Sequence, residues 1–115
     1  MADWLWATLG LLIVGALLAL GMRLTRHKHE AMVALALGEV FRMRGDGPRA
    51  RRFYDAARRA RVRLPEADEG LAALAAGSRA PVVDHPLVED MARRLEREPQ
   101  ALARWLESRG LPRPD

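Results

Sequence analysis

Three histidines carry the side chains best suited to bind a metal ion or transfer a proton. His27 and His29 are two residues apart, and on a helix this spacing points their side chains about 200° from each other. That arrangement suits one metal ion poorly. His85 stands alone before a proline, where a helix is expected to begin. We therefore expect no metal site and interpret these residues as solubilising ones.

Acidic residues form the other candidate cluster. Glu66, Asp68 and Glu69 directly follow Pro65, and the helix dipole favours acids in a first turn, so a structural role explains them. The chain has no cysteine, which excludes disulfides, thiolate metal sites and cysteine nucleophiles. A phosphate-binding glycine loop, a nucleophile elbow and an acid–base pair are also missing from the sequence. We expect a protein that is not an enzyme and that binds no cofactor.

Residues 4–22 are the element that must position everything else. The run WLWATLGLLIVGALLALGM carries no charge, and a helix of this length spans about 30 Å, the thickness of a bilayer's hydrocarbon core. A cleaved signal peptide would instead begin with a basic segment and carry a shorter apolar run. Here the positive charges follow the run. The sequence therefore predicts a transmembrane anchor, with its basic juxtamembrane segment, over residues 1–28.

The charges beside the anchor predict its orientation. Arg23, Arg26 and Lys28 follow it, whereas only Asp3 precedes it, so the positive-inside rule places the C-terminal domain in the cytoplasm and the N-terminus outside. Eighteen arginines and one lysine are typical of a GC-rich bacterial genome, which indicates a bacterial inner membrane. We expect the same three basic residues to contact lipid headgroups.

Small residues form a stripe on the membrane helix. Thr8, Gly15, Ala19 and Met22 lie on one side, and small side chains let a second membrane helix approach closely. A plain anchor of mixed Leu, Ala and Gly is the alternative interpretation.

After the anchor, the periodicity remains helical and predicts an antiparallel hairpin over residues 31–64. A helix over residues 31–43 should stop at Gly45 and Gly47, and Pro48 suits the start of the next helix, which extends to about Arg63. An apolar seam along this second helix, at Ala50, Tyr54 and Ala57, should face the first.

This hairpin resembles a tetratricopeptide repeat, a 34-residue pair of helices with small and large residues alternating at their contact. The positions that match the motif are Leu37, Gly38, Phe41, Ala50, Tyr54 and Ala57. Ala34 and Val62 depart from it, because the motif prefers tryptophan and proline there. The resemblance implies an all-α fold: one transmembrane helix followed by a small tetratricopeptide-like domain of about five helices.

The pattern recurs weakly one repeat later. A shift of 34 residues carries Leu37 to Leu71 and Pro65 to Pro99, which predicts a degenerate second hairpin over residues 65–98. A capping helix over residues 99–109 and a tail over residues 111–115 complete a domain spanning residues 29–110. An unrelated small helical bundle is the alternative.

The resemblance implies where a partner would bind. In this family the first helix of each hairpin lines the groove, at positions that fall here on Met32, Leu35, Glu39, Arg42 and Met43. Methionines adapt to a partner's shape, so an apolar helix or extended peptide is the expected ligand. The alternative is that Met32, Leu35 and Met43 are covered by the protein's own second hairpin or by the membrane surface.

Residues 23–63 carry twelve basic and four acidic side chains, a balance also typical of nucleic-acid binding. The adjacent membrane explains this charge without a nucleic acid, which we do not expect as a partner.

The sequence thus favours a membrane-anchored adaptor for a protein partner. A small accessory subunit, held in a larger membrane complex through its transmembrane helix, is the alternative. A third and weaker resemblance links residues 98–110 to the tail helix by which flagellar basal-body ring proteins engage their rotor partner.

Overall fold

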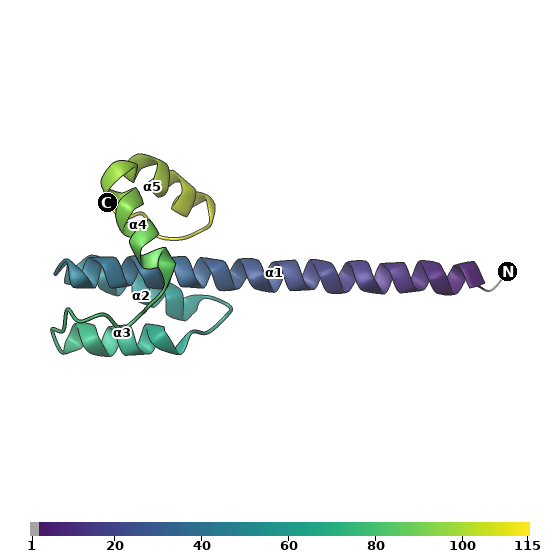
Figure 1. The fold of residues 1–115 in the computed structure, drawn as a ribbon, viewed down its shortest axis with the longest axis horizontal. Helices are drawn as coiled ribbons and strands as arrows, with labels where there is room; N and C mark the ends of the chain where they lie inside the picture. Colours follow the sequence, from purple (N-terminus) through teal and green to yellow (C-terminus); the bar gives the residue numbers. More distant parts are fainter. Residues whose placement is uncertain (1–2) are drawn as a thin grey trace.

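The computed structural model describes residues 3–115, which form helices joined by loops. The helices are α1 (Asp3–Met43), α2 (Gly47–Arg59), α3 (Pro65–Ala75), α4 (Pro86–Arg97) and α5 (Pro99–Ser108). Figure 1 shows a long rod, α1, with the other four helices gathered around its C-terminal part. The predicted all-α class with one long apolar N-terminal helix is confirmed.

The apolar run and the first helix of the domain belong to one continuous helix. No proline occurs between residues 22 and 43, and the charged residues that follow the run are compatible with helix, so nothing ends α1 there. Its apolar part is exposed, from Trp4 to Leu24, and has a mean hydropathy of 2.2 over its best window. The helix is long and apolar enough to cross a membrane. From Ala31 to Arg42 the same helix is buried in the domain, except for half-buried Met32.

A glycine turn ends α1 and starts the hairpin. Gly45 has a φ of 83°, and the amides of Gly45 and Asp46 donate to the carbonyls of Arg42 and Phe41. This is the bonding that closes helices with a left-handed residue. Asp46 then caps α2 through its side chain, which accepts from the Arg49 amide. The predicted stop and restart around Pro48 are therefore present.

The first helix pair packs as an antiparallel hairpin. The core side of α2 is formed by Ala50, Phe53, Tyr54, Ala56 and Ala57. Phe53 stacks on Phe41 of α1 with ring centroids 5.6 Å apart. The arginines of α2 lie outside this seam, as the helical period requires.

The remaining helices are arranged differently from the expected second hairpin over residues 65–98. α3 packs on α1 and α2, whereas α4 packs on α1 and α5, and Figure 1 shows α3 and α4 on opposite sides of α1. The connection between them crosses α1. Consequently the helix over residues 99–109, here α5, packs on α4 and does not cap a second hairpin.

The last residues are packed against the domain. Pro114 is buried, and Arg52 of α2 donates to the carbonyl oxygens of Arg113 and Asp115 at 3.2 and 3.4 Å. The segment expected as a tail, residues 111–115, is therefore part of the folded unit.

Candidate functional site

The residues expected to line a partner groove are mostly inside the protein. Leu35 and Glu39 have no exposed surface and Arg42 is 2% exposed. Met32 is half-buried, and only Met43, at 38%, is open to solvent. The structure thus offers no open groove along these five residues, because Glu39 and Arg42 bind the connection between α3 and α4 and Leu35 is part of the hydrophobic core.

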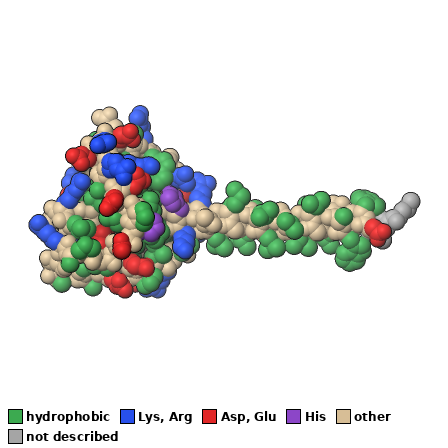
Figure 2. Space-filling model, in the orientation of Figure 1, with side chains coloured by type: hydrophobic (Ala, Val, Ile, Leu, Met, Phe, Trp, Pro, Cys, Tyr) green, Lys and Arg blue, Asp and Glu red, His purple; other side chains and the backbone are tan. Residues whose placement is uncertain are grey.

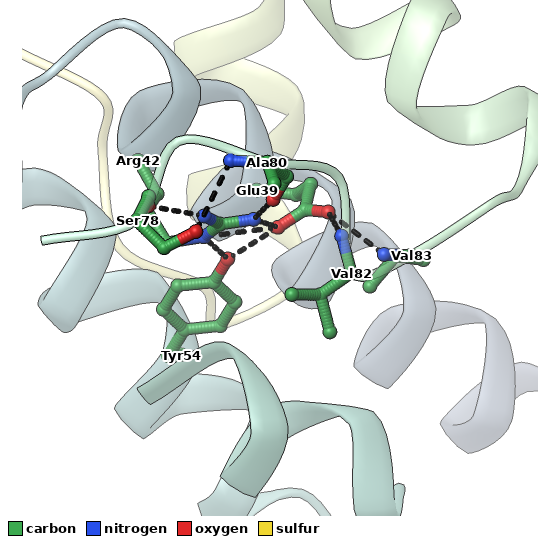
Figure 3. Close-up of polar contacts among 7 residues, drawn as sticks. All are labelled: Glu39, Arg42, Tyr54, Ser78, Ala80, Val82 and Val83. Atoms are coloured by element: carbon green, nitrogen blue, oxygen red, sulfur yellow. Dashed lines mark hydrogen bonds and ion pairs between the residues drawn. The ribbon is translucent and has the colours of Figure 1, made fainter. Parts of the chain in front are cut away.

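Glu39 is the centre of a buried polar network (Figure 3). Its Oε1 atom accepts from the Tyr54 hydroxyl at 2.7 Å and from the guanidinium of Arg42. Its Oε2 atom accepts from the amides of Val82 and Val83 at 2.7 and 2.8 Å. The carboxylate therefore joins α1 and α2 to the connection that crosses them.

Arg42 holds the same connection from the next turn of α1. It donates to the carbonyls of Ser78 and Ala80, and its Nε lies 3.1 Å from the Tyr54 hydroxyl oxygen. Two ionic side chains of α1 thus satisfy four backbone groups of residues 78–83. Pairing and hydrogen bonding of this kind are what buried charges require.

Glu39 and Arg42 remain ionised in this buried network. Burial alone would raise the pKa of Glu39, but the hydrogen bonds from Val83, Arg42, Tyr54 and Val82 outweigh it and hold this pKa below the usual value. Burial raises the pKa of Tyr54, so its hydroxyl keeps its proton and can donate to Glu39. An ionised carboxylate with every partner in place, and no access for substrate, stabilises structure; it is not placed to catalyse a reaction.

The histidines and the acidic cluster are in separate structural positions. His85 caps α4, because its Nδ1 accepts from the Leu87 amide at 3.1 Å. His29 lies edge-on to Trp105, with ring centroids 6.4 Å apart. Glu66 and Asp68 occupy the first turn of α3, as predicted, and Asp68 pairs with Arg58 and Arg63. Within residues 3–115, no group of three His, Cys, Asp or Glu side chains is gathered for a metal ion.

The small-residue stripe lies on the exposed rod of α1. A Cβ atom added to Gly15 would meet nothing within 4 Å, and Ala19 and Met22 are also exposed. The hydroxyl of Thr8 donates to the Trp4 carbonyl of the same helix at 2.8 Å. This side of α1 is therefore exposed and free to contact another helix.

Basic side chains and histidines gather where the rod enters the domain (Figure 2). The three residues expected to contact lipid, Arg23, Arg26 and Lys28, are all exposed there. Arg26 lies 3.5 Å from Glu30, and Arg109, at the end of α5, lies 3.8 Å from the same carboxylate. The structure thus brings residues from both ends of the domain's sequence to the end of the domain where the rod enters it.

The sequence interpretation missed the polar role of Tyr54, which was assigned only to an apolar seam. A signal existed: Glu39 and Arg42, spaced i and i+3 on an otherwise apolar helix, are the pattern of a buried ion pair. No sequence pattern identified their partners at residues 78–83, because these partners are backbone groups, which every residue type carries.

Comparison of the chain with protein-family models, curated proteins and solved structures gives no significant match.

Proposed function

We propose that the protein is a single-pass, membrane-anchored helical adaptor, which presents its folded domain to a protein partner at the cytoplasmic face of a bacterial inner membrane. The continuity of α1 carries this proposal. Its exposed apolar part and its buried part are one helix of 41 residues, so the orientation of the span fixes that of the domain. A chain built in this way positions a surface at the membrane.

Several features support a binding role over a catalytic one. The most polar group of the interior, centred on Glu39 and Arg42, is fully engaged with backbone and side-chain partners. We propose the tetratricopeptide resemblance for the α1–α2 hairpin alone, where Gly38 of α1 faces Tyr54 of α2. The partner surface would then lie outside the five residues first expected, of which only Met43 is exposed.

The alternative is an accessory subunit held by its membrane helix. The exposed stripe of Thr8, Gly15 and Ala19 favours it, because the small side chains at these positions permit close helix contact. The two proposals differ in which part of the chain holds the partner.

Copurification of the full chain in mild detergent, followed by mass spectrometry, separates them. One variant replaces residues 4–22 with an unrelated Leu/Ala span of equal length; another carries Gly15→Leu and Ala19→Leu. Gly10→Leu, on the opposite side of the helix, is the control. If the adaptor proposal is correct, all three variants retain the partner.

Loss of the partner from the first two variants, but not from the control, would favour the accessory subunit. If no protein copurifies specifically with any form, both proposals fail.

A further inference from the structure

A cavity of about 590 Å³ opens at the membrane-proximal end of the domain. We call it the basic cavity. Its charged or titratable lining consists of His27 and Glu30 of α1, Arg59 and Arg61 at the end of α2, and Arg109 after α5. Three segments distant in the sequence thus contribute cations to one hollow.

Two of these arginines carry uncompensated charge. Arg58 and Arg63, from the same stretch of chain, both pair with Asp68 at 3.1 and 3.6 Å. In contrast, Arg59 and Arg61 are exposed and form no ion pair with any residue from 3 to 115. Their guanidinium groups are therefore available to an anion, and arginine suits phosphate in particular because its N–H groups match two phosphate oxygens.

Glu30, the one carboxylate of the lining, does not cancel this charge. It lies within 4 Å of Arg26, Arg109 and His27, so cations of α1 and α5 already compensate it. If the negative charge of Glu30 is counted against the positive charge of Arg109, the net positive charge of the cavity comes from Arg59 and Arg61.

The position of the cavity matches the headgroup layer. Leu24 is the last exposed large apolar residue of the rod, and His27 follows it by three residues, about 4.5 Å along a helix. Headgroups occupy roughly 5–8 Å on each side of the hydrocarbon core. The basic cavity therefore begins at the depth where lipid phosphates lie.

We propose that the basic cavity is a binding site for one anionic glycerophospholipid, whose phosphate is held by Arg59 and Arg61. This inference rests on the proposed placement of α1 in the membrane. It differs from a diffuse attraction through Arg23, Arg26 and Lys28, because it specifies one lipid per chain and a different set of residues.

The test uses the full chain in mild detergent, titrated with dioleoyl phosphatidylglycerol or dioleoyl phosphatidylcholine and observed by native mass spectrometry. The cavity variant carries Arg59→Gln and Arg61→Gln. The control carries Arg44→Gln and Arg51→Gln, which removes equal charge from exposed arginines. Arg44 lies in the turn between α1 and α2 and Arg51 in the first half of α2, whereas Arg59 is the last residue of α2. Because all four arginines are exposed, both variants should fold, and thermal unfolding checks this.

We expect one phosphatidylglycerol per wild-type chain, bound at least about tenfold more tightly than phosphatidylcholine. The cavity variant should lose that preference, whereas the control should keep it. Equal loss in both variants would show diffuse charge attraction, and equal binding of the two lipids would show no anion selectivity; either result overturns the proposal.

Excess inorganic phosphate distinguishes the source of the anion. If it displaces phosphatidylglycerol and raises the melting temperature as much as the lipid does, the cavity is a site for free phosphate and the lipid assignment is wrong. Membrane fractionation distinguishes a failure of the proposed membrane anchor from a failure of the proposed lipid site. A wild-type chain found outside the membrane fraction contradicts the anchor, whereas a membrane-bound chain without lipid preference contradicts this site alone.

Discussion

Gly38 lies against the ring of Tyr54 so closely that a Cβ atom at position 38 would come within 2.8 Å of the ring's Cδ1 atom. Gly70 of α3 meets the same Cδ1–Cε1 edge of this ring, and a Cβ there would also collide with it. The tyrosine is further held by its hydrogen bonds to Glu39 and Arg42. It therefore has little freedom to move away from a larger side chain on α1.

Gly38→Ala should consequently destabilise the protein. Alanine gains up to about 1 kcal/mol of helix propensity over glycine, but overpacking a fixed ring costs about 1–3 kcal/mol. Thermal unfolding of the full chain in mild detergent, followed by circular dichroism, should show a lower melting temperature, and Gly38→Leu should lower it further. Gly47→Ala is the matched control, because its Cβ would make an ordinary contact with Leu74 at 3.8 Å. Equal melting of the Gly38→Ala and Gly47→Ala variants would contradict this packing.

Ala50→Leu tests the same hairpin from α2. Ala50 has no exposed surface, so a larger side chain there has no route to solvent. We expect a loss of about 1–3 kcal/mol in the free energy of unfolding. Arg58→Lys, at an exposed site of the same helix, should leave the melting temperature almost unchanged.

Tyr54→Phe should cost about 1–3 kcal/mol of unfolding free energy, because the ring remains while a buried carboxylate loses a donor. The hydroxyl donates to Glu39 and accepts from Arg42, so both ions would be less well satisfied. Denaturant unfolding of the full chain in detergent measures the loss. Hydrogen exchange at Val82 and Val83 should also become faster, since Glu39 anchors their amides. An unchanged exchange rate would show that the connection is held by other contacts.

The network should make stability depend on acid pH. The pKa of Glu39 is lower in the folded than in the unfolded chain, where it is near 4.5, so its stabilisation is present above that pH. It is lost as pH falls through the folded-state pKa. Asp46, whose hydrogen bond to Arg49 lowers its pKa, contributes in the same direction.

Glu39→Gln isolates the contribution of the carboxylate. At pH 7 this variant should be less stable by about 3 kcal/mol or more, because it leaves Arg42 buried without a counter-charge. The difference from wild type should shrink steadily below about pH 4.5. Unfolding curves for the two proteins between neutral and acid pH measure it, and a constant difference would mean that Glu39 is not ionised in the folded state.

The starts of α2 to α5 were predictable because their signals are local, whereas α2 ends at Arg59, before the expected end near Arg63, because the backbone of Ala60 is extended. Pro48, Pro65, Pro86 and Pro99 each stand in the first two positions of a helix, and Gly45 ends α1 as expected. The continuity of α1 was also in the sequence, since charged residues after an apolar run change a helix's surroundings without ending it. The boundary expected near residue 28, between the anchor and the domain, is not the end of a helix; it marks only where α1 passes from an exposed segment to a buried one.

The path of the chain between α3 and α4 was not predictable in the same way. A weak 34-residue recurrence favoured a second hairpin, but the position of α4 depends on Glu39 and Arg42, which lie more than 35 residues before the connection that they bind. Charged residues are usually exposed, so both were assigned to a surface. They are buried because each supplies the other's counter-charge.

The orientation of the chain gives the last prediction. Two sets of basic residues lie where the rod enters the domain. Arg59, Arg61 and Arg109 belong to the domain, and Arg23, Arg26 and Lys28 belong to α1. A domain with this charge facing the bilayer should remain on the cytoplasmic side, since the transfer of basic flanking segments across the membrane is disfavoured. A protease added to intact spheroplasts should therefore leave a C-terminal tag uncut, whereas lysed spheroplasts should lose it.

A variant with the basic residues on the other side of the apolar run tests whether charge sets this orientation. It carries Arg23→Gln, Arg26→Gln and Lys28→Gln, together with two lysines inserted after Asp3, and the tag should become exposed in part of the population. A tag that is cut in intact cells of the unmodified strain would place the domain outside and refute the predicted orientation.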